Sequence, residues 1–273
     1  MTHRYLFQKP NDGSFYSTPN IVVIGAGGTG SQLLTGLSRM VVALQSLNMA
    51  VPEVIVCDPD TVSRANVGRQ LFSPSDIGQS KAHTLVNRIN QYFGLNWQSY
   101  HGKFTPEIAK SRVIYISCVD SRSARQEIYE AIKENASYWL DLGNNNHSGQ
   151  AILGNSDFHK RSPSAKRKYC LLPTVADLFP EIMDASIAED DDTPSCSLAE
   201  ALVKQDLMVN QTVATHALEL LWQLLRHGEI HYHGFFFDNR NFSLQSLPID
   251  RDHWKRLMKQ AKKYRKPVSA QAA

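Results

Sequence analysis

Four glycines in one short turn are the first residues of this sequence whose types and spacing suit chemistry. Gly25, Gly27, Gly28 and Gly30 follow the apolar run at residues 21–24 and precede leucines at helical spacing. Glycine has no side chain, so the backbone of such a turn can approach phosphate oxygens, and the next helix offers unpaired N–H groups. The pattern predicts a strand, a phosphate-binding turn and a helix. Nicotinamide enzymes and ATP-using enzymes share it, so both classes stay open here.

A carboxylate and several cationic or amide side chains follow the second apolar run, at residues 54–57. Asp58 ends that run, where a carboxylate can hold the hydroxyls of a ribose. Asp60 is either a second acidic contact or a residue that orders the loop. Because a triphosphate needs cations and hydrogen-bond donors, the segment that follows favours ATP over a nicotinamide cofactor. Its candidate phosphate contacts are Asn66, Arg69, Gln70 and Lys81.

Another acidic residue stands just beyond a third apolar run. Asp120 follows residues 113–116, so we expect it at the carboxyl edge of a parallel sheet, where ligands bind. A carboxylate there can hold Mg²⁺ between phosphates. The alternative is that Asp120 caps the helix predicted from residue 122, because aspartate is a good N-cap residue. The two roles are compatible.

The elements that must position these residues alternate along the chain. Helices are predicted behind the glycine turn and at residues 81–91 and 122–134. Strands are predicted at residues 21–24, 54–57, 96–101, 113–116, 138–141 and 150–153. Continuous apolar strands between helices indicate an α/β fold with a doubly wound, mostly parallel, Rossmann-like sheet.

We divide the chain into five parts. Residues 1–19 are interpreted as a flexible N-terminal arm, and residues 20–153 as the nucleotide-binding domain. Residues 154–196 are interpreted as a crossover loop region, because charged residues replace the periodic pattern. Residues 197–250 are predicted to form one long helix (197–226), stopped by Gly228, and a β-hairpin. Residues 251–273 are a basic, helix-prone C-terminal tail.

Taken together, these motifs resemble the ThiF/MoeB-type adenylyltransferases, whose fold is that of the ubiquitin-activating enzymes. The matched pattern is GxGGxG, then D-x-D-x-V-x-x-x-N-x-x-R-Q from Asp58 to Gln70, then G-x-x-K ending at Lys81, then the strand-end Asp120. It covers roughly residues 20–145. Within the family, residues 192–202 look most similar to the ThiF-like component of plasmid-borne PRTRC cassettes.

The resemblance implies an enzyme that uses ATP and Mg²⁺ to activate the C-terminal carboxylate of a small ubiquitin-like protein, giving an acyl adenylate and pyrophosphate. It also implies a homodimer and a conjugating-enzyme-like partner. The resemblance also implies a role for each candidate residue. The nucleotide-binding turn is formed by Gly25, Gly27, Gly28 and Gly30, and the ribose is bound by Asp58, with Asp60 nearby. The phosphates are bound by Asn66, Arg69 and Gln70, the developing charge is stabilised by Lys81, and the metal is bound by Asp120.

Many members of this family also carry a cysteine that takes the activated protein as a thioester, and Cys196 is the candidate here. Ser197 and Glu200 form a capping-box pattern, so Cys196 would precede a helix N-terminus, whose field favours a thiolate. The acidic run at residues 189–192 opposes that ionisation. The alternative interpretation is a structural cysteine in a loop-to-helix turn.

Composition excludes several other classes. The chain has 273 residues and a net charge of +3, and no apolar run is long enough for a membrane span. Its four cysteines show no CxxC pairing, so we expect no zinc, and a cytoplasmic protein with free thiols. Cys57 and Cys118 are expected in the core, and His231 and His233 as ordinary strand residues. The basic residues at 255–266 fit a solvated helix face better than a nucleic-acid site.

Two positions depart from the family pattern. Family members often insert an N-terminal arginine into the partner subunit, and Arg4 is a weak substitute for it. Ser121 stands where an asparagine commonly follows the strand-end aspartate. Three rival functions stay open: a nicotinamide oxidoreductase, a non-catalytic nucleotide-binding adaptor of a plasmid cassette, and ATP-dependent modification of a small molecule or tRNA.

Overall fold

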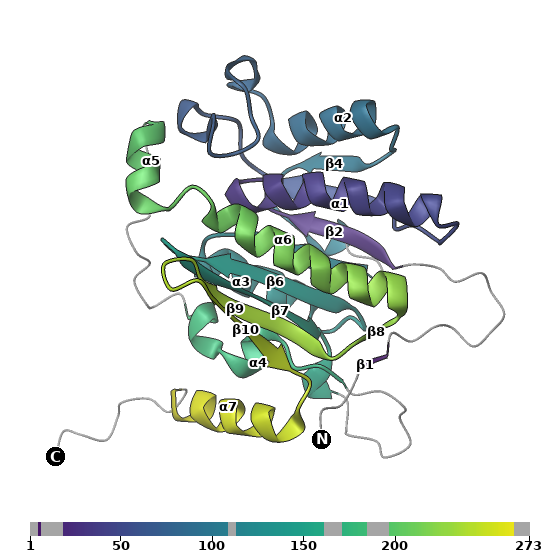
Figure 1. The fold of residues 1–273 in the computed structure, drawn as a ribbon, viewed down its shortest axis with the longest axis vertical. Coiled ribbons are helices and arrows are strands. Elements are labelled where there is room, and N and C mark those ends of the chain that lie inside the picture. The colour runs from purple at the N-terminus through teal and green to yellow at the C-terminus, as the bar shows by residue number, and fades with distance from the viewer. Residues whose placement is uncertain (1–4, 7–18, 109–112, 161–170, 185–196, 265–273) are drawn as a thin grey trace.

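An eight-stranded sheet with helices on both faces organises the computed structural model (Figure 1). The structure describes residues 5–6, 19–108, 113–160, 171–184 and 197–264. The strand order is β10-β9-β7-β6-β5-β2-β3-β4. The strands are β2 Asn20–Ile24, β3 Val54–Asp58, β4 Gln98–His101, β5 Val113–Ser117, β6 Tyr138–Asn144, β7 Ser148–Asn155, β9 Tyr232–Asp238 and β10 Ser243–Pro248.

Strands β2 to β6 are parallel to one another, whereas β7, β9 and β10 pair antiparallel along one side of the sheet. The predicted fold class, a mostly parallel doubly wound α/β sheet, is therefore confirmed. The predicted hairpin is also confirmed, as the β9–β10 pair. A second, two-stranded sheet joins β1 Tyr5–Leu6, within the predicted arm, to β8 Glu229–Ile230.

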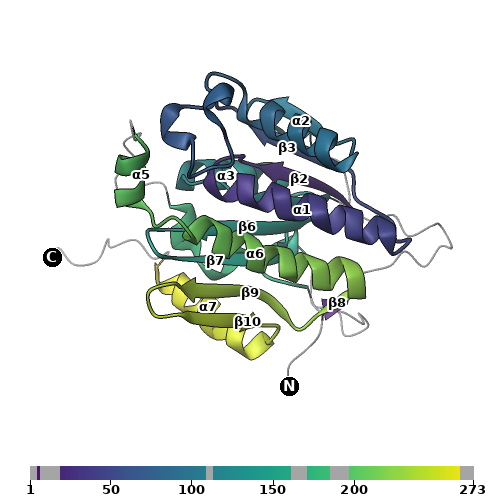
Figure 2. The same cartoon turned by 45° about the horizontal axis from the view of Figure 1, so that its top comes forward.

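The helices form a layer on each face. The α-helices are α1 Gly28–Ser46, α2 Lys81–Phe93, α3 Arg122–Ile132, α4 Val175–Leu178, α5 Leu198–Lys204, α6 Val209–Trp222 and α7 Arg251–Tyr264. Short 3₁₀ turns lie at Arg64–Asn66, Pro74–Asp76, Pro106–Ile108, Phe158–Lys160 and Pro180–Met183, and a π turn at Gln223–His227 extends α6. Helices α1, α2 and α6 cover one face, with α1 and α6 side by side in both views (Figures 1 and 2), while α3 and α4 lie on the other.

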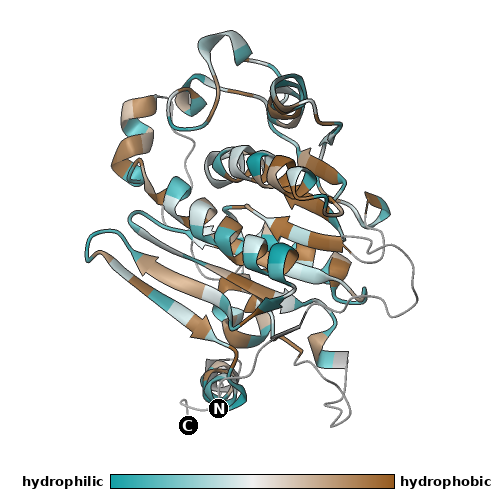
Figure 3. Cartoon of the chain, turned by 45° about the vertical axis from the view of Figure 1, so that its right-hand side comes forward, coloured by the Kyte–Doolittle hydropathy of each residue, from teal (hydrophilic) through white to brown (hydrophobic). Residues whose placement is uncertain are grey.

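The core follows from the apolar runs of the central strands. Ile21, Val23, Ile114 and Ile116 are fully buried, as expected for strands that helices cover on both sides. Figure 3 shows these apolar strands in brown between the flanking helices. No helix in the described ranges is long and apolar enough to cross a membrane.

The prediction of one long helix over residues 197–226 is wrong. The chain forms α5 and α6, separated at Gln205, whose backbone is extended (φ −150°, ψ 127°). The backbone N–H of Asp206 donates to the carbonyl of Asn146, at 2.9 Å, instead of continuing the helical ladder. A contact distant in sequence therefore breaks the helix. Gly228 does end the π turn in the left-handed region, as predicted (φ 74°).

A buried histidine anchors the last helix. His233 of β9 is fully buried; one ring nitrogen is 2.8 Å from the carbonyl of Leu153, and the other accepts the indole N–H of Trp254 in α7, at 2.9 Å. The ring is therefore held neutral, with its proton on the nitrogen that faces Leu153. Burial, with a smaller contribution from nearby His253, lowers the pKa of His233 from 6.5 to about 4, although the hydrogen bond to Leu153 acts in the opposite direction. His231 is exposed.

This histidine predicts a loss of stability in mild acid. Its unfolded pKa is about 6.5 and its folded pKa about 4, so between these values the unfolded chain binds more protons. The free energy of unfolding should fall as the pH drops through that window, by on the order of 3 kcal/mol from this group. Urea unfolding at several pH values measures it. His233→Gln keeps a donor and an acceptor but does not titrate, so an unchanged pH dependence in this variant would contradict the assignment.

Candidate active site

The site lies where the chain reverses its direction across the sheet. Strand β2 sits between β3 and β5, so the loops after β2 and β5 leave toward opposite faces and open a crevice at the carboxyl ends of the strands. Gly25 has φ 97° and comes so close to β5 that an added Cβ would lie 2.7 Å from the carbonyl oxygen of Cys118. The glycine turn and the segment leading to Asp120 are therefore neighbours, as the sequence predicts.

The glycines of the turn are required for different structural reasons. A Cβ on Gly30 would overlap the carbonyl oxygen of Gly25, and one on Gly28 would lie 2.9 Å from the amide of Asn210. A Cβ on Gly27 would meet only the Gln70 side chain, at 4.0 Å. Gly27, the N-cap of α1, therefore leaves room beside the N–H groups of the first turn of the helix. Such a cradle fits a phosphate.

Asp58 ties the glycine turn to the end of β3. Its carboxylate accepts the backbone N–H of Ala26 at 2.5 Å and that of Asp60 at 2.8 Å. The residue is 4% exposed, and burial raises its pKa, although both hydrogen bonds and the charge of Lys81 act in the opposite direction. Its first contribution is therefore to hold the turn, and ribose binding stays a proposal.

Lys81 is held at the same end of the sheet by Asp60. The segment between them folds back so that the Lys81 N–H donates to the Asp60 carbonyl at 3.0 Å, and the ammonium lies 2.9 Å from the Asp60 carboxylate. Lys81 is 7% exposed, whereas the side chain of Asp60 is 62% exposed. Asp60 thus orders the loop and forms an ion pair with a buried cation. This geometry supports the loop-ordering alternative for Asp60.

Arg69 and Gln70 bring unpartnered polar atoms to the glycine turn. The Nε of Arg69 and the Oε1 of Gln70 are buried without a hydrogen-bond partner among the described residues. Burial lowers the pKa of Arg69, and the nearby carboxylate of Asp120 opposes that effect. Arg69 and Asp120 therefore lie near enough for their charges to interact. A buried guanidinium N–H without a partner is costly, so that of Arg69 suits a site that an anionic ligand completes.

Asn66 and Asp120 have different surroundings. Asn66 is buried, and its Oδ1 accepts the N–H of Ser63 at 2.8 Å, so this oxygen caps the Arg64–Asn66 turn. Asp120 is exposed. The N-cap of α3 is Ser121, which accepts the N–H of Ala124 at 3.2 Å, so the alternative that Asp120 caps this helix is wrong. The serine at the position of the family's asparagine has this capping role.

One exposed carboxylate beside a phosphate cradle fits the way Mg²⁺ is usually held, between protein carboxylates and substrate phosphates. The described residues contain no cluster of three His, Cys, Asp or Glu that would bind a metal without such phosphates. That Asp120 holds the ion stays a proposal.

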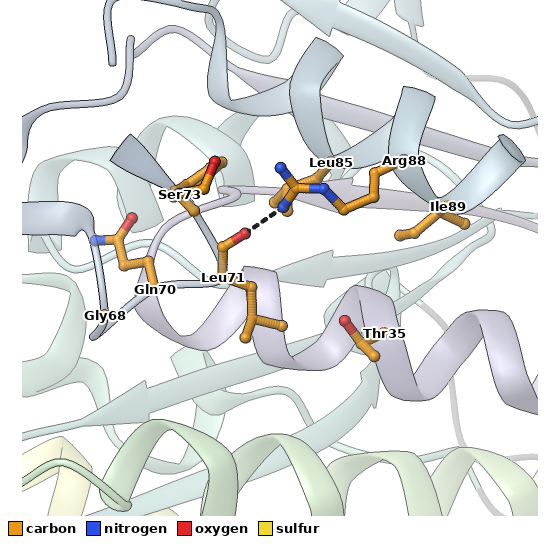
Figure 4. A pocket seen from close by; sticks show the side chains of 9 residues that line it. Thr35, Gly68, Gln70, Leu71, Ser73, Leu85, Arg88 and Ile89 are labelled. Atoms are coloured by element: carbon orange, nitrogen blue, oxygen red, sulfur yellow. Dashed lines mark hydrogen bonds between the residues drawn. The ribbon is translucent and has the colours of Figure 1, made fainter. Parts of the chain in front are cut away.

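The Gly68–Ser73 segment borders a hollow of about 480 Å³ (Figure 4). Helix α1 contributes Thr35, and α2 contributes Leu85, Arg88 and Ile89. Arg88 donates to the Leu71 carbonyl at 2.7 Å and pairs with Asp76 at 2.8 Å. Its charge is therefore committed to supporting the loop, and the lining offers no other cation for a phosphate.

The cysteines differ in how far the structure describes them. Cys57 is 1% exposed, and burial raises its pKa to about 12, which confirms a core role. Cys118 packs partly buried against the core, and burial raises its pKa too. Cys196 lies outside the described residues. Ser197 does cap α5, accepting the N–H of Glu200 at 3.2 Å, as the capping pattern predicts.

Sequence analysis missed a buried ion pair behind Asp120. Arg125 of α3 pairs with Asp141 of β6 at 2.9 Å and donates to the carbonyl of Val119 at 2.7 Å. The two side chains are 6% and 0% exposed, and Ser117 also donates to Asp141, at 2.6 Å. Arg125 therefore fixes the backbone just before Asp120. The one sign of this pair in the sequence was a charged residue in a predicted helix that packs against buried strands.

Sequence analysis also missed two residues on the α6 side, Gln205 and Asn210. Gln205 accepts from Arg69 at 2.9 Å and from Asn210 at 2.8 Å. Both are polar residues inside the range predicted as one long helix, and their polarity was the only signal for them in the sequence.

Comparison with known proteins identifies the family. The ThiF family model matches residues 16–259, and the chain belongs to the ThiF family. It is similar to ubiquitin-like modifier-activating enzyme 5 of Drosophila virilis (27% identical over 162 residues) and of Bombyx mori (30% identical over 162 residues). Each match covers 53% of this chain and 38% of the relative, so the chain spans about two fifths of the length of these relatives.

Two solved structures show the same fold. Escherichia coli MccB, in a structure with ATP, has a TM-score of 0.55 at 13% identity, covering 86% of this chain and 65% of MccB. PaaA has a TM-score of 0.55 at 14% identity, covering 85% of this chain and 64% of PaaA.

The buried ion pair predicts a large and specific stability effect. Arg125→Met leaves the Asp141 carboxylate uncompensated, so the free energy of unfolding should fall by about 3–5 kcal/mol. Lys255→Met is the matched control, because Lys255 pairs with Asp252 at 3.0 Å on the surface, and its loss should cost less than about 1 kcal/mol. Urea unfolding at pH 7 measures both. Equal effects would contradict the buried-pair account.

Proposed function

We propose that this protein is an ATP-dependent adenylyltransferase that activates the C-terminal carboxylate of a small ubiquitin-like protein. The observation that carries the proposal is the convergence of Arg69, Gln70 and the open cradle at Gly27 beside Asp120. Membership of the ThiF family and similarity to modifier-activating enzymes support adenylation. The likeness to MccB, whose structure with ATP has this fold, supports nucleotide binding.

In the proposed reaction, an oxygen of the acceptor carboxylate attacks the α-phosphorus of ATP. A bond forms between that oxygen and phosphorus, the bond to the oxygen bridging to the β-phosphate breaks, and pyrophosphate leaves with its electron pair. Arg69 and Lys81 stabilise the developing negative charge, and the turn N–H groups position the phosphates. Asn66 and Gln70 add hydrogen bonds. The proposed role of Asp58 is to hold the ribose, and that of Asp60 is to position Lys81 through their ion pair.

Mg²⁺ would be held by Asp120 together with the phosphates, where it neutralises charge on the transferred group. Cys196 is the proposed acceptor of the activated protein in a later thioester step. A homodimer, a conjugating-enzyme-like partner and the link to PRTRC cassettes are proposals that follow from the family resemblance. A non-catalytic adaptor would bind nucleotide at the same residues. An experiment must therefore measure catalysis, because nucleotide binding alone does not distinguish an enzyme from an adaptor.

ATP–pyrophosphate exchange tests the proposed function. Purified protein, Mg-ATP and labelled pyrophosphate are mixed with a small ubiquitin-like protein and with the same protein lacking its C-terminal residue. Exchange should need the intact C-terminus. Arg69→Ala and Asp120→Ala should each reduce it about 10²- to 10³-fold, as expected when a charge-stabilising contact is lost.

Arg64→Ala is the control, because Arg64 is an exposed arginine in the same loop and its loss should leave exchange unchanged. Cys196→Ala should keep exchange and abolish a thioester that is sensitive to reducing agent. Nucleotide binding without exchange, for any acceptor, would favour the adaptor instead.

A further inference from the structure

The connection between α5 and α6 reaches back to the nucleotide site. Lys204 ends α5, Gln205 is extended, and Val209 begins α6. The Asp206 N–H donates to the carbonyl of Asn146 in the β6–β7 turn, and the Gln205 amide lies 3.4 Å from the carbonyl of Asn145. These contacts fix the backbone of the connection to the carboxyl end of β6. They turn the side chain of Gln205 toward Arg69 and away from the helix.

Gln205 joins two donors that have no other common partner among the described residues. Its Oε1 accepts from Nη1 of Arg69 at 2.9 Å and from Nδ2 of Asn210 at 2.8 Å. A carbonyl oxygen has two lone pairs, so these bonds use its full capacity. Gln205 is neutral, so it fixes the direction of the guanidinium without adding a negative charge beside it. A carboxylate at this position would form the same bonds and add that negative charge.

Asn210 carries the link to the first turn of α1. It is 3% exposed, and its Oδ1 accepts the hydroxyl of Thr29 at 2.9 Å and the amide of Asn144 at 3.3 Å. Because Gly28 has no side chain, the side-chain amide of Asn210 can occupy the space beside it. Asn210 therefore uses both ends of its amide, one toward Gln205 and one toward the helix whose N-terminus forms the phosphate cradle. A buried amide that is hydrogen-bonded at both ends orders its surroundings.

We propose that Gln205 and Asn210 are positioning residues of the nucleotide site. Gln205 holds Arg69 in place for the phosphates without neutralising it, and Asn210 sets the distance between Gln205 and the first turn of α1. The inference rests on the proposed function, because it takes Arg69 to be a phosphate contact. It extends the site beyond residues 20–145, where the sequence motif lies, onto the α5–α6 connection.

Nucleotide binding tests the inference, with affinities for Mg-ATP and for adenosine measured by calorimetry. Gln205→Ala should weaken Mg-ATP about tenfold, the worth of one hydrogen bond to a charged group, and leave adenosine unchanged because it has no phosphates. Gln205→Glu should weaken Mg-ATP at least as much, although it keeps the accepting oxygen. In an Arg69→Ala background, Gln205→Ala should have no further effect.

Gln211→Ala is the control, because Gln211 is an exposed amide next to Asn210 in α6. It should bind both ligands as the wild type does. Thermal unfolding of every variant reports whether the fold is kept, and the Glu variant preserves the size of the side chain should the Ala variant unfold.

Equal weakening of adenosine and ATP, or the same tenfold loss with and without Arg69, would overturn the positioning role. Wild-type pyrophosphate exchange is measured separately. If the wild type binds ATP but shows no exchange, the proposed function is contradicted. The affinities of the Gln205 variants for Mg-ATP and adenosine would still decide the positioning role of Gln205. A wild-type protein that does not bind ATP would overturn both.

Discussion

The approach of the glycine turn to the end of β5 is the constraint from which the site follows. Gly25 packs against the carbonyl of Cys118 in a left-handed conformation, and Gly30 packs against Gly25 itself. Side chains at these positions would push α1 away from the sheet. Only because they are absent can the first turn of α1 start beside the loop that carries Asp120. The buried carboxylate of Asp58 then holds the turn from the β3 side, through the N–H of Ala26.

Charge is arranged around this turn in two ways. Lys81 is buried and forms an ion pair with the carboxylate of Asp60, whereas Arg69 is hydrogen-bonded to a neutral amide, with the charge of Asp120 nearby. The first cation has a charged hydrogen-bond partner, and the hydrogen-bond partner of the second adds no charge. Behind them, the Arg125–Asp141 pair neutralises its own charges inside the protein and stabilises the backbone before Asp120.

Local patterns in the sequence predicted those strands, turns and helix caps that depend on interactions between residues close together in the chain. The apolar runs, the glycine turn and the caps at Ser197 and Gly228 each depend on neighbours in the chain, and the structure has them. The break at Gln205 depends on the carbonyl of Asn146, which is distant in sequence, so the periodic stripe predicted a continuous helix instead. Asn210 and Arg125 were missed for the same reason, since their partners lie on other elements.

The contact between Gly28 and Asn210 also has a consequence for how related sequences can diverge. The amide of Asn210 fills the volume that a side chain at position 28 would need. A lineage that gains alanine at position 28 must therefore shrink or move the residue at position 210, and then loses the bonds to Thr29 and Gln205. The two positions, far apart in the chain, are expected to co-vary as a pair, with glycine retained wherever the asparagine is kept.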